Sequence, residues 1–164
     1  MNHETAVEIE YDIAMYFGPA RYVIIPNVYW SILPWECDLA LLTKSNYLYE
    51  VEIKISKQDL MRDRAKRKWV HHDGYKTRKT WFAIPEKLRD CVEYIPEKAG
   101  VLVVSKTGVV SQIREARTDT KARKLYVSEQ LRFMRLGSLR MWTLKKVLLQ
   151  HMELKDKEKI HGNT

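Results

Sequence analysis

The stretch that decides the fold is CDLALLTKSNYLYEVEIKI, which runs from residue 37 to residue 55. It holds two runs rich in apolar and β-branched residues, 37–43 and 47–55, with the polar Lys44-Ser45-Asn46 between them. Runs of this length and composition on either side of a turn signal are typical of paired strands. The stretch therefore predicts a hairpin in the middle of a sheet.

The second run alternates strictly between residue types. Side chains point to opposite faces of a strand at every step, so Glu52 and Lys54 share one face and Val51 and Ile53 share the other. An acidic residue two places before a lysine also occurs at Asp119 and at Glu153, but on segments expected to be loop or helix, where such a pair does not share a face. Only the strand sets its carboxylate and ammonium side by side.

The first run adds Asp38 near the start of an apolar strand, where a carboxylate is costly unless it is paired or ligating. Hairpin pairing sets 38–42 beside 48–52 and brings Asp38 toward Glu52. Two adjacent carboxylates repel, and a divalent cation relieves the repulsion while leaving room for water and phosphate. Lys54 can then orient or deprotonate the attacking water, or neutralise phosphate charge. Ordinary ion pairs with Lys54 or with an arginine from 62–68 are the alternative.

A helix over residues 4–17 should precede the hairpin and end at Gly18-Pro19. Its apolar stripe contains Ile9, Ile13 and Phe17, and Glu10 falls within that stripe whereas Glu8 points away. Glu10 is thus the better candidate for a third carboxylate at the site. The alternative is that Glu10 lies at the edge of the stripe and reaches solvent.

Elements after the hairpin alternate in type. Ser56 and Asp59 form an S-x-x-D box that starts a helix over 57–68. A strand near 79–84, a short helix from Pro85 and a hairpin of 101–105 with 109–113 follow. With a β-rich run at 22–26, the order is α-β-β-β-α-β and then a hairpin, which predicts an α/β fold with a three-layer core and a mixed sheet.

The C-terminal part predicts two helices, 121–135 and 138–155, separated by Gly137-Ser138. Their apolar positions recur at helical spacing, so we expect an antiparallel pair packed on the core. The whole chain, 1–164, reads as one domain, with a core over about 4–117 and a helical elaboration over about 118–155.

Charge is distributed unevenly over a chain of net charge +8. Residues 1–53 hold eight acidic and two basic side chains, whereas residues 54–80 hold ten basic and three acidic ones. This suits a protein that holds a cation at one place and a polyanion around it. The helix after the site carries the candidate DNA-phosphate contacts, which are Lys57, Arg62, Arg64, Lys66, Arg67 and Lys68. The alternative is a solvated basic face.

Other compositional signals exclude several classes. No stretch approaches the ~20 apolar residues of a membrane span, and the acidic start lacks the apolar core of a signal peptide. The two cysteines, Cys37 and Cys91, are not in metal-ligand spacing and read as reduced thiols. We therefore expect a cytoplasmic protein.

Beyond these patterns, the chain resembles the PD-(D/E)XK nuclease superfamily and, more narrowly, the MmcB-like group of DNA-repair nucleases. The resemblance covers about residues 5–117. It rests on ECDLALL, YEVEIKIS-x-x-DL, RDRAKRKW, WFAIPE and IPEKAGVLVVSKTGVVSQIREA. The proline of the family name is replaced by Cys37, and the stretch leading to Trp69 is more basic than in the repair group.

The resemblance implies a restriction-endonuclease-like core and roles for particular residues. Asp38, Glu52 and the carbonyl of Ile53 would be ligands of Mg²⁺ or Mn²⁺, and Lys54 would be the catalytic lysine. Glu10 matches the position of a helical glutamate in the less similar Holliday-junction resolvases. The implied activity is hydrolysis of DNA phosphodiester bonds in repair, recombination or phage DNA processing. Two alternatives stay open: a non-catalytic DNA-binding module, and a protein-interaction subunit whose tail binds a second copy or a helicase.

Overall fold

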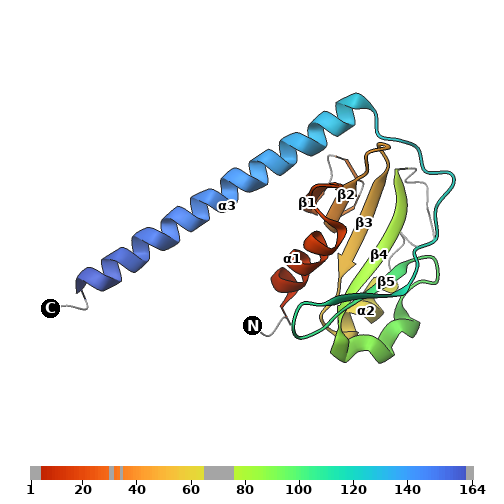
Figure 1. Ribbon diagram of the computed structural model, residues 1–164, viewed down its shortest axis with the longest axis horizontal. Coiled ribbons are helices and arrows are strands. Elements are labelled where there is room, and N and C mark those ends of the chain that lie inside the picture. Colours follow the sequence, from red (N-terminus) through yellow and green to blue (C-terminus); the bar gives the residue numbers. More distant parts are fainter. Residues whose placement is uncertain (1–4, 30–31, 34, 65–75, 162–164) are drawn as a thin grey trace.

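A six-stranded mixed sheet is built around the hairpin of residues 37–55 (Figure 1). The computed structural model describes residues 5–29, 32–33, 35–64 and 76–161, with side chains throughout except at 63–64 and 156–161. The strands lie side by side in chain order. They are β1 (Val23–Val28), β2 (Cys37–Leu42), β3 (Leu48–Ile53), β4 (Thr77–Pro85), β5 (Gly100–Val104) and β6 (Val110–Arg114).

The strand directions follow from the connections. β1, β2 and β3 pair antiparallel, as do β5 and β6. Short turns join β2 to β3 and β5 to β6, a connection that antiparallel neighbours allow. β3 pairs parallel with β4, and β4 with β5. These two crossovers contain helix α2 (Lys57–Arg64) and the 3₁₀ helix η2 (Glu86–Tyr94), respectively. The chain is therefore an α/β protein with a mixed sheet, as the sequence predicts.

Helix α1 (Ala6–Phe17) covers one face of the sheet. It begins with a capping box in which the Thr5 hydroxyl accepts from the Glu8 N–H and the Glu8 carboxylate accepts from the Thr5 N–H. Its buried residues Ile9, Ile13 and Phe17 belong to a core cluster with Leu39, Val51 and Ala83 of the central strands. Glu8 is thus engaged at the helix start, Asp12 is buried at 8% exposure, and Glu10 is half-buried.

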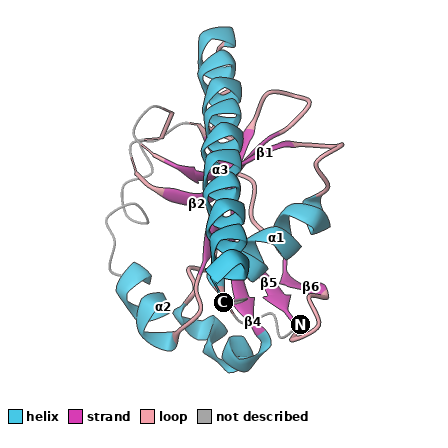
Figure 2. Ribbon diagram, turned by 90° about the vertical axis from the view of Figure 1, so that its left-hand side faces the viewer, coloured by secondary structure: helices cyan, strands magenta, loops and turns pink. Residues whose placement is uncertain are grey.

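The opposite face carries two further clusters, and α1 and α2 lie on opposite sides of the sheet (Figure 2). Leu60 of α2 and Leu88 of η2 pack with Phe82 and Ile84 of β4. Phe133 of helix α3 (Val127–His161) packs with Ile25 of β1. Between these clusters the same face carries the acidic side chains of β3.

The predicted element order through residue 114 is confirmed, and boundaries shift by a few residues. The helix expected over 57–68 is described as α2 to Arg64, and the rest of that range lies outside the described residues. The predicted Ser56–Asp59 cap is present: the Ser56 hydroxyl donates to the Asp59 carboxylate and accepts from the Asp59 N–H. The expected hairpin around Thr107-Gly108 is formed by β5 and β6.

The predicted C-terminal helical pair is wrong. Residues 127–161 form one continuous helix, α3, and the segment before it is non-helical. Gly137 does not break the helix because its missing side chain serves packing: a Cβ there would lie 3.0 Å from Cδ1 of Ile25. A glycine in a helix costs only about 1 kcal/mol, and close packing on β1 offsets that cost.

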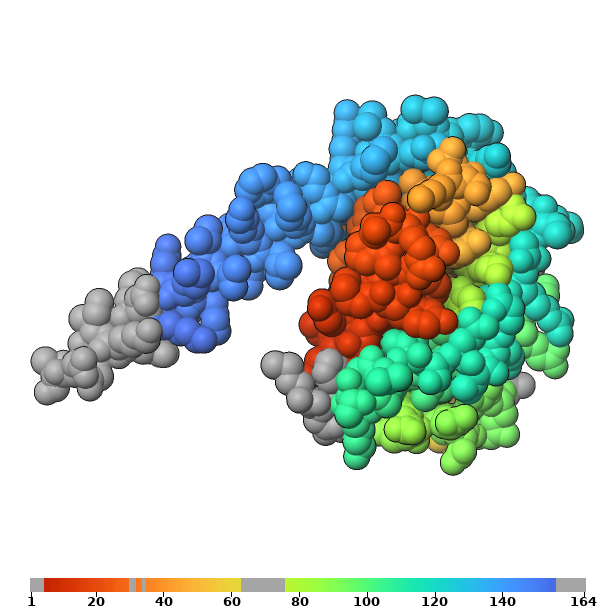
Figure 3. Space-filling model, viewed as in Figure 1, coloured from red at the N-terminus to blue at the C-terminus, as the bar shows by residue number. Residues whose placement is uncertain are grey.

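Beyond this contact α3 leaves the domain as an extended arm (Figures 1 and 3). Arg140 donates to the carbonyl of Asn27 over 2.8 Å, and every described side chain from Met141 to Lys155 is exposed. The apolar residues of this arm therefore do not pack on the core, contrary to the sequence expectation. Within the described ranges no helix, α3 included, has the length and apolarity that crossing a membrane requires.

Candidate active site at the β2–β3 edge

Asp38 and Glu52 occupy neighbouring positions at the end of the β2–β3 ladder. The β2–β3 register pairs Leu39 with Val51, so the next step outward sets Asp38 level with Glu52. Glu52 is 3% exposed, whereas the Asp38 side chain is 40% exposed. One carboxylate thus lies inside the fold and the other at its surface, as expected at the mouth of a site.

Lys54 lies between the two carboxylates. Its Nζ is 3.0 Å from Oε2 of Glu52 and 4.0 Å from Oδ2 of Asp38. The carboxylates can be no farther apart than these two distances combined. The Lys54 side chain is 11% exposed, and its backbone N–H donates to the carbonyl of Ala83 over 3.0 Å. The site is therefore fixed by the central strands β2, β3 and β4.

The backbone of Ile53 faces the same group. Its N–H donates to Oδ2 of Asp38 over 2.7 Å. In an extended strand the N–H and C=O of one residue point toward the same neighbouring strand, so the Ile53 carbonyl also points to the β2 side. The role expected of the Ile53 carbonyl, as a ligand of a metal ion, stays a prediction.

Glu10 of α1 lies within electrostatic range of this site. Burial raises the pKa of the Glu10 carboxyl, and the negative charge of Asp38 raises it further. The side chain is half-buried. Helix α1 and strand β2 thus bring a third acidic group toward Asp38.

Cys37 is a buried thiol beside the acidic group. Burial raises its pKa well above the ordinary value, and the charges of Glu50, Glu52 and Asp38 act in the same direction. Its Sγ is 3.0 Å from the carbonyl oxygen of Leu39, to which it donates. A thiol held in its protonated form is a poor nucleophile, so Cys37 serves packing here.

Glu50 shares the strand face of Glu52 but has a different environment, which the sequence analysis missed. It is 2% exposed, accepts from the indole N–H of Trp35 at 3.1 Å, and accepts from the hydroxyl of Thr77. These bonds satisfy a buried charge and tie the segment before β2 to β3 and β4. Trp35 is partly buried against the core.

The predicted basic helix is described only in part. Lys57 lies over the ring of Tyr94 at 5.0 Å, and a hydrogen bond with Tyr94 raises its pKa. Arg62 is 70% exposed and pairs with Asp59 at 3.0 Å. The side chain of Arg64, and residues Lys66, Arg67 and Lys68 altogether, lie outside the described residues.

The carboxylate oxygens of Asp38 and Glu52 can be compared with the ligands that a divalent cation requires. Within the described ranges, no group of three His, Cys, Asp or Glu side chains is arranged to hold a metal. Mg²⁺ does not require such a group, because it binds through one or two carboxylates and completes its shell with water and phosphate oxygens. Asp38 and Glu52 are hard oxygen donors that converge within reach of one ammonium, so they fit this requirement.

Comparisons with known proteins support the fold only. No family model matches the chain, and no curated protein matches it. A solved structure, the SPO1766 protein of unknown function from Silicibacter pomeroyi, is similar with a TM-score of 0.59 and 15% sequence identity. The match covers 84% of this chain and 86% of that one. At this identity the likeness shows a shared α/β fold.

Proposed function

We propose that the chain is a metal-dependent nuclease of the PD-(D/E)XK class that hydrolyses DNA phosphodiester bonds. The observation that carries the proposal is the convergence of Asp38, Glu52 and Lys54 at one end of the central hairpin. The element order α-β-β-β-α-β around a mixed sheet adds support, because it is the order that the sequence resemblance implies. The finer family assignment rests on the sequence resemblance.

Asp38 and Glu52 would hold Mg²⁺ or Mn²⁺, with the carbonyl of Ile53 as a further oxygen donor. A bound cation of this kind stabilises negative charge on a reacting phosphate and lowers the pKa of water. Glu52, buried at 3% exposure, supplies a carboxylate whose position is fixed by the sheet.

Lys54 supplies a positively charged group to the proposed site. Its Nζ lies 3.0 Å from Glu52, which orients it toward the acidic end of the site. From there it can orient the attacking water or neutralise charge that develops on a phosphate oxygen. Glu10, whose pKa burial and the charge of Asp38 raise, would hold a water molecule by a hydrogen bond.

The direct test is cleavage of a panel of labelled single-stranded, nicked, branched and duplex DNAs with Mg²⁺ or with EDTA. We expect Mg²⁺-dependent cleavage of at least one substrate, and loss of it in Lys54→Ala. Lys106→Ala, an exposed lysine in the β5–β6 turn, is the matched control and should cut normally. Binding without Mg²⁺-dependent cleavage on every substrate would favour the non-catalytic DNA-binding alternative.

A second candidate function, protein interaction through α3, has its own supporting observation. Large apolar side chains are exposed along the arm, among them Leu139, Met141, Trp142, Leu144, Leu148 and Leu154 at 55–70%. A helix that is apolar on more than one side is normally buried. Since the described part of the chain does not cover the arm, a second copy of the chain is the proposed occupant: one self-complementary surface suffices for a symmetric dimer.

A further inference from the structure

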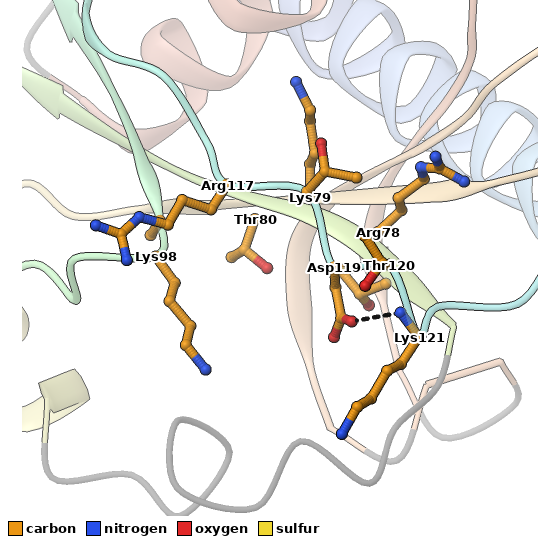
Figure 4. Close-up of a pocket in the computed structure, with 11 residues that line it drawn as sticks. Arg78, Lys79, Thr80, Lys98, Arg117, Asp119, Thr120 and Lys121 are labelled. Atoms are coloured by element: carbon orange, nitrogen blue, oxygen red, sulfur yellow. Dashed lines mark hydrogen bonds between the residues drawn. The ribbon is translucent and has the colours of Figure 1, made fainter.

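A basic hollow lies at the N-terminal end of β4. It has a volume of about 320 Å³ and is formed by β4, the start of β5 and the segment that follows β6. The side chains that define it are Arg78, Thr80, Lys98, Arg117, Asp119 and Lys121, and Figure 4 shows Lys98 and Lys121 extending on either side of Thr80 and Asp119. A fifth basic residue of the lining, Lys79, is paired with Glu115. The other four cations and one carboxylate give the hollow a positive charge.

The hollow shares a sheet face with the proposed catalytic carboxylate. The β3–β4 register pairs Glu50 with Thr80 and Glu52 with Phe82. Alternation along β4 puts Thr80 and Phe82 on one face and Trp81, which packs against α1, on the other. Thr80 is thus two residues, roughly 7 Å, along the strand from the level of Glu52.

Backbone hydrogen bonds fix the walls of the hollow. The N–H of Arg117 donates to the carbonyl of Lys98 at 2.9 Å, and the N–H of Asp119 donates to the carbonyl of Arg78 at 2.8 Å. The Asp119 carboxylate accepts from the N–H of Lys121 at 2.9 Å, which engages its one negative charge in the turn. These hydrogen bonds hold the backbone segments from which the basic side chains extend.

The charges in this hollow are only partly neutralised. The Arg78 guanidinium stacks on the ring of Tyr47 at 3.8 Å, and Arg117 is 3.9 Å from the exposed carboxylate of Glu97. Lys98 and Lys121 are exposed, and among the described residues neither ammonium has an ion-pair partner. Exposed ammonium groups beside threonine hydroxyls suit the oxygens of a phosphodiester rather than an apolar ligand.

We infer that the basic hollow binds the sugar-phosphate backbone of the DNA strand whose scissile bond lies at Asp38, Glu52 and Lys54. The inference rests on the proposed function for its substrate. A separation of roughly 7 Å along β4 is within the reach of neighbouring nucleotides of one strand. Lys98 and Lys121 contact phosphates at the hollow. The phosphate that is cut lies at Asp38, Glu52 and Lys54.

The test is DNA affinity of the full chain with Lys98→Ala and Lys121→Ala combined. A short fluorescein-labelled duplex is titrated in EDTA at several salt concentrations, and fluorescence anisotropy reports binding. Affinity should fall about tenfold, and the slope of log affinity against log salt should flatten by about 1.8, because two phosphate contacts are lost. The matched control combines Lys106→Ala with Lys145→Ala, two exposed lysines far from the hollow with the same total charge change.

The control pair should change affinity by less than about twofold, since its lysines would contact no phosphate. Equal losses in the two pairs, no loss in the hollow pair, or no DNA binding by the unaltered chain would each overturn the inference. A chain with Lys98→Arg and Lys121→Arg keeps both positive charges and should bind DNA like the unaltered chain. Cleavage is scored separately: a chain that binds through the hollow but never cuts with Mg²⁺ would refute the nuclease and leave the hollow standing.

Discussion

The backbone N–H of Ile53 donates a hydrogen bond to Oδ2 of Asp38 across 2.7 Å, joining a peptide of β3 to a side chain of β2. The bond lies one step beyond the last paired residues of the hairpin, Leu39 and Val51. Asp38 thus takes the place of a ladder hydrogen bond at the strand end, so its carboxylate is oriented before any ligand arrives. Such preorientation favours electrostatic catalysis because it removes the cost of reorganising the group.

The substitution Asp38→Asn removes the negative charge of this side chain and keeps its shape, so it tests the role of the charge alone. The amide oxygen can still accept from Ile53, so the melting temperature should change by less than about 3 °C. Cleavage should fall about a hundredfold or more, which is a loss of about 2.7 kcal/mol of transition-state stabilisation. Asp90→Asn, an exposed carboxylate of η2, is the control and should cut normally. Full activity in Asp38→Asn would remove this residue from the proposed site.

A change from Glu to Gln at the two buried carboxylates of β3 should affect different properties: stability at Glu50 and cleavage at Glu52. Glu50→Gln loses one acceptor for Trp35 and Thr77, so the free energy of unfolding should fall by about 1–2 kcal/mol. Its rate at saturating DNA should stay within a few-fold of the unaltered chain. Glu52→Gln keeps an oxygen for Lys54 but loses the charge, so stability should hold while cleavage is lost. Urea unfolding and single-turnover cleavage measure the two effects.

Glu129 should make the start of α3 acid-sensitive. Hydrogen bonding to Arg123, together with Lys76 and the N–H of Tyr126, lowers the pKa of this carboxyl from 4.5 to about 2. A folded-state pKa below the unfolded one adds stability that is present above pH 4.5 and is lost as the pH falls toward 2. After discounting for solvent screening, the gain is about 2 kcal/mol at neutral pH.

Glu129→Gln removes that contribution. The variant should be less stable than the unaltered chain at pH 7, and the difference should shrink steadily between pH 4.5 and pH 2. Thermal unfolding across this range measures it, with Glu97→Gln, an exposed carboxylate, as the control. A stability difference that does not depend on pH would show that Glu129 acts through packing alone.

The site could be predicted from the sequence because it depends on local rules. A hairpin with a short turn fixes its own register, and strand alternation fixes faces, so Asp38, Glu52 and Lys54 had to converge if the strands formed. By the same rules Glu50 and Glu52 are equally good candidates for the site, because both lie on the same face of the strand. Their difference depends on Trp35 and Thr77, which come from distant segments, and no local pattern encodes those contacts.

The structure of the C-terminal region could not be predicted from the sequence, because it depends on contacts with distant segments. Gly137-Ser138 is a common signal for a break between helices, and nothing in the neighbouring residues says otherwise. The reason for the glycine is Ile25 on β1, which a side chain at this position would meet at 3.0 Å. Likewise, the basic hollow joins Arg78 to Lys98 and Lys121 through backbone contacts between segments that are far apart in the sequence.

The exposed arm of α3 should make the chain self-associate. Pairing between two copies would remove apolar surface from water along most of the arm, and standard stable interfaces bury about 800 Å² per partner. In light scattering the unaltered chain should have about twice its 19.5 kDa mass. Leu144→Glu with Leu148→Glu should be a monomer with an intact core, because both side chains point away from the domain at 70% and 58% exposure.

The control must add the same charge to apolar side chains that are equally exposed but lie elsewhere. Val7→Glu with Val109→Glu meets this condition, since these residues are 75% and 61% exposed on α1 and the β5–β6 turn. This pair should remain dimeric. If the unaltered chain is a monomer at every concentration, or if both pairs dissociate it equally, α3 does not mediate self-association. Cleavage by the monomeric variant then shows whether each copy holds a complete site, which the positions of Asp38, Glu52 and Lys54 within one sheet predict.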